Sequence, residues 1–153
     1  MKVKSRPASD ASAANLPEKA ATIAAWFFGG HGAMSDANRT FTGGCHCGLV
    51  RFECTSDLAM VTSCNCSICT KKGLHFTFLP PRSFQLRAGG DNLREYLFNK
   101  HAIRHQLCAD CGVDVFARGR KSDGSEVVAL NVSCIDGIEL AKLKMTPIDG
   151  RNR

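Results

Sequence analysis

The sequence lacks the long apolar run that a membrane-spanning helix requires, which is about 18 or more consecutive residues. The apolar segment TIAAWFF covers only residues 22–28 and begins too far into the chain for a typical secretory signal peptide. Extended basic stretches are also missing, since no run of positive residues exceeds two, as at Lys71-Lys72. A membrane segment and a polyanion-binding tail are therefore not predicted.

Long amphipathic helical patterns are absent from residue 40 onward, where short alternating runs are separated by glycine, proline and asparagine. Val50, Phe52 and Cys54 alternate with polar residues, and Phe76 and Phe78 are predicted to point inward. Strands are predicted at 49–54, 75–80, 84–89, 95–99, 113–119 and 126–134. The fold class is therefore mainly β, with two sheets or one folded sheet and few short helices.

The composition divides the chain into two parts. Residues 1–38 form an Ala/Ser-rich N-terminal extension, which is expected either to be disordered or to contain a short docking helix that opens near Asn15. The apolar residues 23–28 would then dock on the domain or on a second subunit. Residues 39–150 are expected to form one domain with its own core.

Cysteine is abundant, with nine residues in the chain. Seven of them fall in tight groups, which are Cys45/Cys47, Cys64/Cys66/Cys69 and Cys108/Cys111, while Cys54 and Cys134 stand alone. Disulfide frameworks usually spread their cysteines, whereas gaps of one or two residues are typical of metal ligation in a reducing compartment. Two zinc ions per chain and a cytoplasmic location are therefore predicted, with disulfides or a redox pair as alternatives.

GGCHCG (43–48) and CADCG (108–112) together predict a closed, structural zinc site. Residues i and i+2 of an extended chain point to the same face, so Cys45 and Cys47 can bind one ion. Cys108 and Cys111 lie in a sharp turn that the following glycine permits. Four thiolates fill the tetrahedral shell of zinc and leave no position for a substrate.

CNCSIC (64–69) contains Cys64, Cys66 and Cys69, one ligand fewer than tetrahedral zinc requires. The fourth position is either open to substrate or filled by a side chain, and the candidates are Cys54, Cys134, His75, His101 and His105. The two cysteines among them continue apolar strand faces and are more simply explained as buried thiols. His105, three residues before Cys108, is expected to support the first site by a hydrogen bond.

An open fourth position would favour thiol chemistry. Three thiolates and Zn²⁺ leave a net charge of −1, which makes the ion a poor Lewis acid for water and a better holder of a soft ligand. A metal-bound thiolate stays deprotonated at neutral pH and remains nucleophilic. Addition of a small thiol to an electrophilic carbonyl is therefore predicted. Cations for a carboxylate-bearing thiol are available at Lys71, Lys72, Arg82, Arg104 and Arg118.

The net charge must be corrected for such sites. The formal value of +6 counts every cysteine as neutral. Seven thiolates on two Zn²⁺ ions would lower it to about +3. The sequence therefore does not favour a nucleic-acid partner.

These residues resemble the family of glutathione-dependent formaldehyde-activating enzymes, and more closely its branch that contains centromere protein V. The matching segments are, in family order, GGCHCGLVRFE, CNCSICTKKG, HFTFLPPRSFQLRAG, EYLFNKHAIRHQLCADCGVDVF and NVSCIDG. They span residues 41 to about 137 and include all seven clustered cysteines. Residues 1–38 lie outside the resemblance.

The resemblance implies the β-tent fold of the Mss4-like superfamily, pinned by two zinc ions. It assigns structural roles to Cys45, Cys47, Cys108 and Cys111 and catalytic roles to Cys64, Cys66 and Cys69. The implied reaction is condensation of glutathione with formaldehyde to S-(hydroxymethyl)glutathione, formally that of a carbon–sulfur lyase. The alternative is a zinc-stabilised binding module without chemistry, in which Cys134 or a histidine closes the second site. A chromatin- or microtubule-binding role is not favoured, because an extended basic, proline-rich N-terminal tail is missing.

Overall fold

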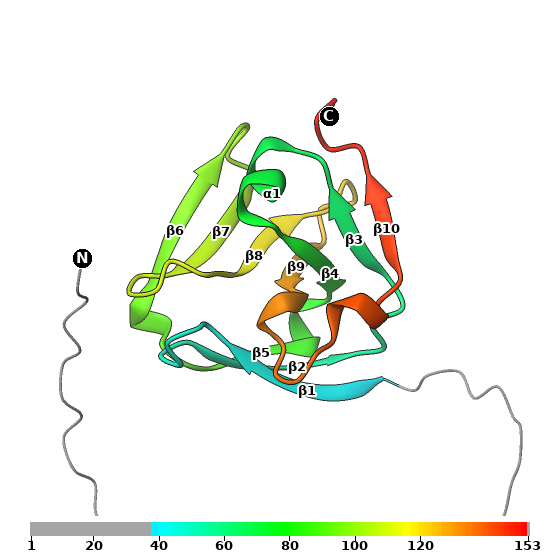
Figure 1. Cartoon of the computed structure of the whole chain (residues 1–153). Coiled ribbons are helices and arrows are strands. Elements are labelled where there is room, and N and C mark those ends of the chain that lie inside the picture. Colours follow the sequence, from blue (N-terminus) through cyan, green and yellow to red (C-terminus); the bar gives the residue numbers. More distant parts are fainter. Residues whose placement is uncertain (1–37, 153) are drawn as a thin grey trace, which may run out of the picture. The chain divides into compact units, whose positions relative to one another are not determined.

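Two β-sheets form the framework of residues 38–152, the part of the chain that the computed structural model describes (Figure 1). The small sheet has the order β1-β2-β5, formed by Arg39–Gly44, Arg51–Ser56 and Phe84–Ala88. The large sheet has the order β10-β3-β4-β9-β8-β7-β6, formed by Met145–Ile148, Val61–Cys64, His75–Leu79, Glu126–Asn131, Asp114–Arg120, Ile103–Cys108 and Leu93–Phe98. The prediction of a mainly β fold is confirmed.

Helices are few and short in this part of the chain. The α-helix α1 spans Ser67–Lys72, and 3-10 turns lie at Pro81–Ser83, Gly90–Asn92, Val132–Cys134 and Leu140–Lys142. None of the helices within residues 38–152 has the length and apolar character needed to cross a membrane. The predicted docking helix near Asn15 and the apolar residues 23–28 fall outside the described residues.

One face of the large sheet packs against the small sheet and builds the larger core. The rings of Phe52, Phe84 and Phe116 follow one another there, with centroid separations of 5.6 and 4.7 Å. Val128 and Leu130 of β9 are fully buried in the same cluster. Successive residues of a strand point to opposite faces, so the next residue along from Val128, Ala129, belongs to the other side of the sheet.

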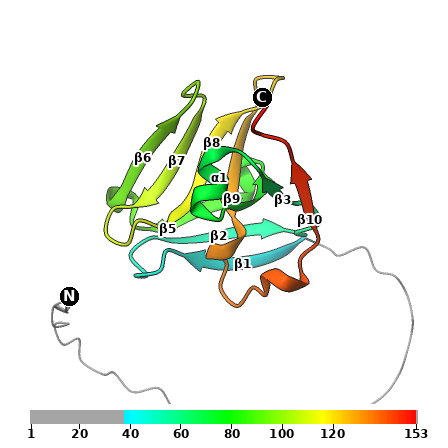
Figure 2. The same cartoon turned by 45° about the horizontal axis from the view of Figure 1, so that its top comes forward.

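The opposite face of the large sheet carries α1 and a smaller apolar cluster (Figure 2). Ile68 and Cys69 of α1 pack there with Phe76 of β4, above Ala117 of β8 and Ala129 of β9. The two alanines are direct cross-strand partners. Because both side chains are small, they leave space above the sheet next to α1.

The inward orientation predicted for both phenylalanines of β4 is correct for only one of them. Phe76 is 6% exposed, whereas Phe78 is 47% exposed. Both lie on the same face of β4, as alternation requires. Phe76 packs in the cluster with α1, while Phe78 lies beyond that cluster and lines a cavity. Exposure on this face is therefore set by how far α1 extends over it.

The two faces predict different costs for shortening a phenylalanine. Phe116→Ala should lower the free energy of unfolding by about 3–5 kcal/mol, because it removes a ring that is buried on all sides. Phe78→Ala, the matched control on the exposed site, should lower it by less than about 1 kcal/mol. Urea unfolding at constant metal content measures both, and equal losses would contradict the burial described here.

Candidate metal centres and the cavity beside them

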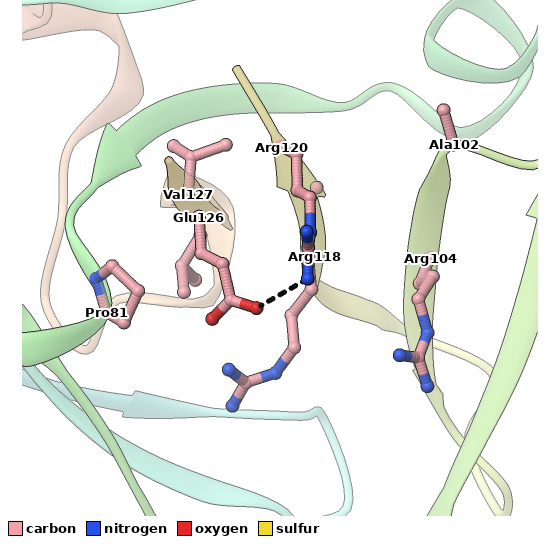
Figure 3. A pocket seen from close by; sticks show the side chains of 9 residues that line it. Pro81, Ala102, Arg104, Arg118, Arg120, Glu126 and Val127 are labelled. Carbon is pink, nitrogen blue, oxygen red and sulfur yellow. Dashed lines mark ion pairs between the residues drawn. The ribbon is translucent and has the colours of Figure 1, made fainter. Parts of the chain in front are cut away.

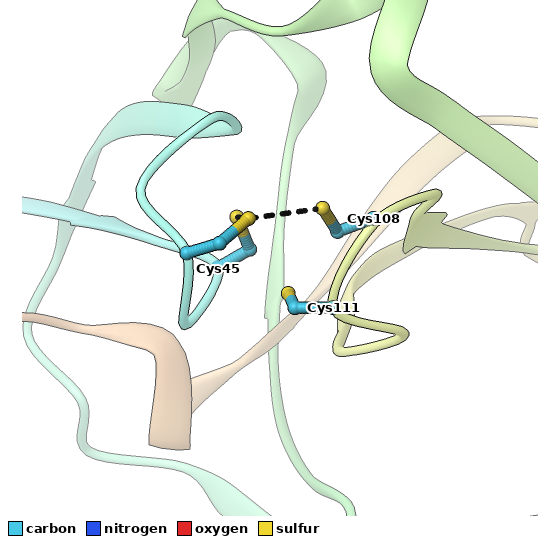
Figure 4. A group of neighbouring side chains, drawn as sticks. Cys45, Cys108 and Cys111 are labelled. Atoms are coloured by element: carbon cyan, nitrogen blue, oxygen red, sulfur yellow. Dashed lines mark hydrogen bonds between the residues drawn. The ribbon is translucent and has the colours of Figure 1, made fainter. Parts of the chain in front are cut away.

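The first cysteine cluster lies where the turn between β1 and β2 meets the turn between β7 and β8 (Figure 4). Cys45 and Cys47 come from the first turn, Cys108 is the last residue of β7, and Cys111 lies in the turn that follows it. In both turns the residue after the second cysteine is a glycine with positive φ, 80° and 74°. The four Sγ atoms lie within 4.8 Å of one another. The structure thus brings together the four cysteines whose spacing predicted one site.

Nitrogen donors point at these sulfur atoms. The backbone N–H of Val50 donates to Cys45 Sγ over 3.3 Å, and Asn92 Nδ2 donates to Cys108 Sγ over 3.5 Å. Such donors stabilise thiolates. The Sγ–Sγ distances are 3.4 Å between Cys45 and Cys47 and 3.6 Å between Cys47 and Cys108, far longer than a disulfide bond of about 2.05 Å. All nine cysteines are free thiols, so the arrangement fits a metal ion rather than a disulfide.

The ionisation of the first cluster also favours a cation. Burial raises the pKa of Cys111, but backbone hydrogen bonds from Val113 and Cys47 and contacts with neighbouring sulfurs outweigh it and lower the pKa to about 6. A backbone hydrogen bond from Leu49 lowers the pKa of Cys47, yet the sulfur of Cys45 and its neighbours raise it to about 12. One thiolate therefore suppresses ionisation of the next, and a divalent cation removes that repulsion.

The second cluster forms at the junction of β3 and α1. Cys64 ends β3, Cys66 is the N-cap residue of α1, and Cys69 lies in the first turn of the helix. Their Sγ atoms lie within 4.8 Å of one another, and the backbone N–H of Cys66 donates to Cys64 Sγ over 3.5 Å. Gly73 ends the helix in the left-handed conformation, with φ of 62°, which glycine adopts without strain. The helix therefore ends three residues after Cys69, at Lys72.

Ionisation in the second cluster follows the same rule as in the first. Burial raises the pKa of Cys66, but hydrogen bonds from the backbone and sulfur of Cys69, and from the sulfur of Cys64, lower it below its usual value. Burial and the neighbouring Cys66 raise the pKa of Cys69. The cluster can carry several thiolates only with a cation between them.

None of the predicted fourth ligands joins the second cluster. Among residues 38–152, no further cysteine sulfur, histidine nitrogen or carboxylate oxygen lies within the same 4.8 Å of its three sulfurs. Cys54 and Cys134 are buried in the larger core, where burial raises their pKa to about 11 and about 12. His101 is exposed in a turn. A tetrahedral ion here would have one position without a protein ligand.

The segment after β10 forms one side of the second cluster. Because β10 pairs in parallel with β3, its end lies beside Cys64. Asn65 donates from Nδ2 to Asp149 over 2.9 Å and accepts the backbone N–H of Arg151 over 2.9 Å. A Cβ added at Gly150 would overlap Cys64 Sγ. This segment was not predicted from the sequence, although the Asp-Gly pair after MTPI is a signal of a tight turn.

A cavity of about 370 Å³, called here the cysteine cavity, opens beside the second cluster on the α1 side of the large sheet. Cys64, Cys66 and Cys69 all line it, together with His105 and Lys100. Most of the remaining lining is apolar and includes Phe76, Phe78, Phe98, Ile103, Ala117 and Ala129. The three-sulfur cluster therefore faces an apolar cavity large enough for a small molecule.

His105 was expected to support the first cluster by a hydrogen bond. It lines the cysteine cavity instead. It lies on β7 with Cys108, but Cys108 is buried in the larger core while His105 lines the cavity on the other face. Its Nδ1 contacts Asp114 Oδ2 at 3.0 Å, and Lys72 Nζ contacts the same oxygen at 3.4 Å. The side chains of His105 and Asp114 are 4% and 1% exposed. Sequence spacing gave no sign of this buried network.

Two of the predicted cations lie on the wrong face to reach the cysteine cavity. Arg104 and Arg118 are cross-strand partners on β7 and β8, and they line a separate cavity of about 360 Å³ with Arg120 and Glu126 (Figure 3). Arg120 pairs with Glu126 over 3.6 Å, and Arg104 pairs with Glu95 over 2.7 Å. Of the five predicted cations, Lys72 is the one held beside His105.

Comparison with known proteins places these features in one family. The family model described as glutathione-dependent formaldehyde-activating enzyme matches residues 40–148, which include all seven clustered cysteines. Among solved structures, the crystal structure of a Rhodobacter sphaeroides protein, a Northeast Structural Genomics target, matches with a TM-score of 0.60 and 26% sequence identity. That match covers 69% of this chain and 97% of the other.

The contact between Gly150 and Cys64 predicts a selective loss of metal. Gly150→Ala should lower the bound metal by about one ion per chain, because the added methyl group displaces one sulfur of the second cluster. Metal analysis by mass spectrometry checks this against Gly119→Ala, whose added Cβ meets its nearest neighbour at 3.8 Å and should bind as much metal as the wild type. Unchanged metal in Gly150→Ala would contradict the prediction.

Proposed function

The chain belongs to the glutathione-dependent formaldehyde-activating enzyme family, and from this premise we propose that it condenses glutathione with formaldehyde at a zinc ion held by Cys64, Cys66 and Cys69. The product is S-(hydroxymethyl)glutathione, and the reverse direction is that of a carbon–sulfur lyase. The resemblance to the family is confirmed, while assignment to the centromere protein V branch stays a prediction.

One observation carries the proposal: the second cluster supplies three sulfur ligands, and no fourth ligand of the described chain, on the wall of a cavity. The first cluster supplies four and would fill a tetrahedral shell. A closed shell supports a structural role, whereas an incomplete shell beside a cavity supports substrate binding. The geometry therefore supports the same division as the cysteine spacing, with a structural first cluster and a substrate-binding second cluster.

Zinc bound by three thiolates would hold the sulfur of a fourth, exogenous thiol in its anionic form. The apolar lining of the cysteine cavity would keep water from that sulfur and from the aldehyde, which protects the nucleophile and disfavours hydration of the carbonyl. The lone pair of that sulfur would form the new C–S bond as the C=O π bond opens, and the oxygen would take up the proton that the thiol gave up. The rate gain would come from orientation and from a preformed thiolate.

The first cluster would serve this reaction indirectly. Its cysteines come from a turn of the small sheet and a turn of the large sheet, so a bound ion would fix one sheet against the other. A structural zinc ion of this kind contributes folding free energy. Loss of this site should therefore impair folding before it impairs chemistry.

Cysteine-to-serine variants of the two clusters should fail in different ways. Cys66→Ser should bind one zinc ion fewer and should lose its acceleration of glutathione–formaldehyde exchange, while its secondary structure persists. Cys45→Ser should unfold at lower temperature because the link between the sheets is weakened. Exchange rates come from NMR exchange spectroscopy, with the protein-free rate as the baseline, and folding from circular dichroism.

The wild-type protein gives the decisive comparison. Exchange above the protein-free rate in the wild type, absent in Cys66→Ser, supports the proposal. Wild-type protein with two zinc ions and no acceleration would remove this reaction and leave a zinc-stabilised binding module as the better interpretation. Unfolding of Cys66→Ser would instead assign its cluster a structural role.

A further inference from the structure

We propose that His105 carries the proton of the reaction from the thiol sulfur to the aldehyde oxygen, and that Asp114 and Lys72 hold it in place for this. The inference rests on the proposed function and adds a catalytic residue to it. The condensation joins R–SH and H₂C=O to give R–S–CH₂–OH, so exactly one proton must leave sulfur and reach oxygen. Neither an oxidant nor a further reactant is needed.

The position of His105 suits this task. It lines the cysteine cavity with all three sulfurs of the second cluster, and its ring lies 6.2 Å from that of Phe76, which packs against Cys69 in the smaller apolar cluster. Its side chain is 4% exposed, so the ring has little contact with bulk water. A titratable group that shares an apolar cavity with a candidate thiol site is suited to exchange protons with the ligand there.

The contact with Asp114 decides which nitrogen of His105 is available. The carboxylate lies 3.0 Å from Nδ1, so the Nδ1–H donates to it and Nε2 of the neutral ring is left as the proton acceptor. Asp114 is itself fixed, because Asn131 of β9 donates to its backbone oxygen over 2.9 Å. The ring can therefore accept a proton at Nε2 without changing its orientation.

Asp114 places a buried carboxylate directly beside the ring of His105. Its side chain is 1% exposed, and its Oδ1 has no hydrogen-bond partner among the described residues. The other oxygen, Oδ2, contacts both Lys72 Nζ and His105 Nδ1, so the carboxylate lies between a lysine and the ring. An imidazolium formed during the reaction at His105 would lie 3.0 Å from this carboxylate, whose Oδ2 also contacts Lys72 Nζ.

Lys72 connects this pair to the second cluster. It lies in α1 one turn after Cys69, and its Nζ contacts Asp114 Oδ2 at 3.4 Å and sits 5.9 Å from the centre of the Tyr96 ring. The helix that presents a sulfur of the cluster thus also reaches the carboxylate that holds His105. The titratable and charged groups that face His105 or share its cavity are Asp114, Lys72, Tyr96, Lys100, Cys64, Cys66 and Cys69.

The relay consists of two proton transfers, one before and one after the C–S bond forms, and they balance. Nε2 first accepts the proton that the thiol releases as its sulfur binds, and the sulfur lone pair then attacks the carbonyl carbon. The alkoxide oxygen next takes the same proton from Nε2, which restores the neutral ring. One residue thus acts as base and then as acid within a single turnover.

His105→Gln tests the relay, because glutamine is similar in size and polarity but cannot carry the proton. Glutathione–formaldehyde exchange measured by NMR should fall by about 10²- to 10⁴-fold. Binding of glutathione should persist, which absorption spectra of the Co²⁺-loaded protein report independently of turnover. Asp114→Asn keeps a polar partner for Nδ1 and removes the charge, so it should reduce exchange less than His105→Gln and likewise retain binding.

Rescue by free imidazole separates proton transfer from a packing role. In His105→Ala, added imidazole can enter the vacated space and should restore part of the exchange, whereas a merely structural defect would not respond. His101→Asn is the matched control: His101 is exposed, does not line the cavity and has a φ of 57°, which asparagine accepts. This variant and the wild type should exchange at the same rate with and without imidazole.

Several results would overturn the inference, and they differ from failure of the proposed function. If the wild type accelerates exchange and His105→Gln matches it, His105 carries no proton. Loss of glutathione binding together with exchange would make His105 a binding residue instead, as would absence of rescue in a folded His105→Ala with two metal ions. A wild type that does not accelerate exchange would refute the proposed function itself, and the relay with it.

Discussion

The meeting of four sulfur atoms from Cys45, Cys47, Cys108 and Cys111 is the constraint on which the rest of the structure depends. Two turns, one from each sheet, must approach closely enough to bring these atoms within 4.8 Å, and the neighbouring thiolates repel one another unless a cation lies between them. A cation bound there would hold together the two sheets that enclose the aromatic core. The opposite face of the large sheet is left free of the small sheet, which is where α1 and the second cluster lie.

Local spacing allowed the sequence to predict the two clusters and the fold class. Cys-x-Cys and Cys-x-x-Cys place the ligands within each pair side by side through short-range geometry, whereas the meeting of the Cys45/Cys47 pair with the Cys108/Cys111 pair depends on the fold. The strand predicted at 126–134 ends instead at Asn131, because the side chain of this residue accepts the N–H of Ser133 and starts a 3-10 turn. Short strands such as β3 and β10 have four residues each and little pattern of their own.

The sequence could not determine which face of the large sheet each strand residue would lie on. Adjacent positions on β7, Arg104 and His105, line different cavities, and so do Ala117 and Arg118 on β8. Alternation predicts that neighbours diverge, but it does not say which face lies beside the second cluster, because that depends on where α1 packs. The small side chains of Ala117 and Ala129 gave no functional signal either, although their size leaves room for the cavity.

The parallel pairing of β10 with β3 has a consequence for biosynthesis. The two strands are 84 positions apart, and the turn after β10 is hydrogen-bonded to Asn65 between two cysteines of the second cluster. A growing chain on the ribosome therefore makes these cysteines long before it makes the strand that borders them. The border that this segment provides for the second cluster is present only after residue 150 has been synthesised, so interrupted translation products would retain the three cysteines without it.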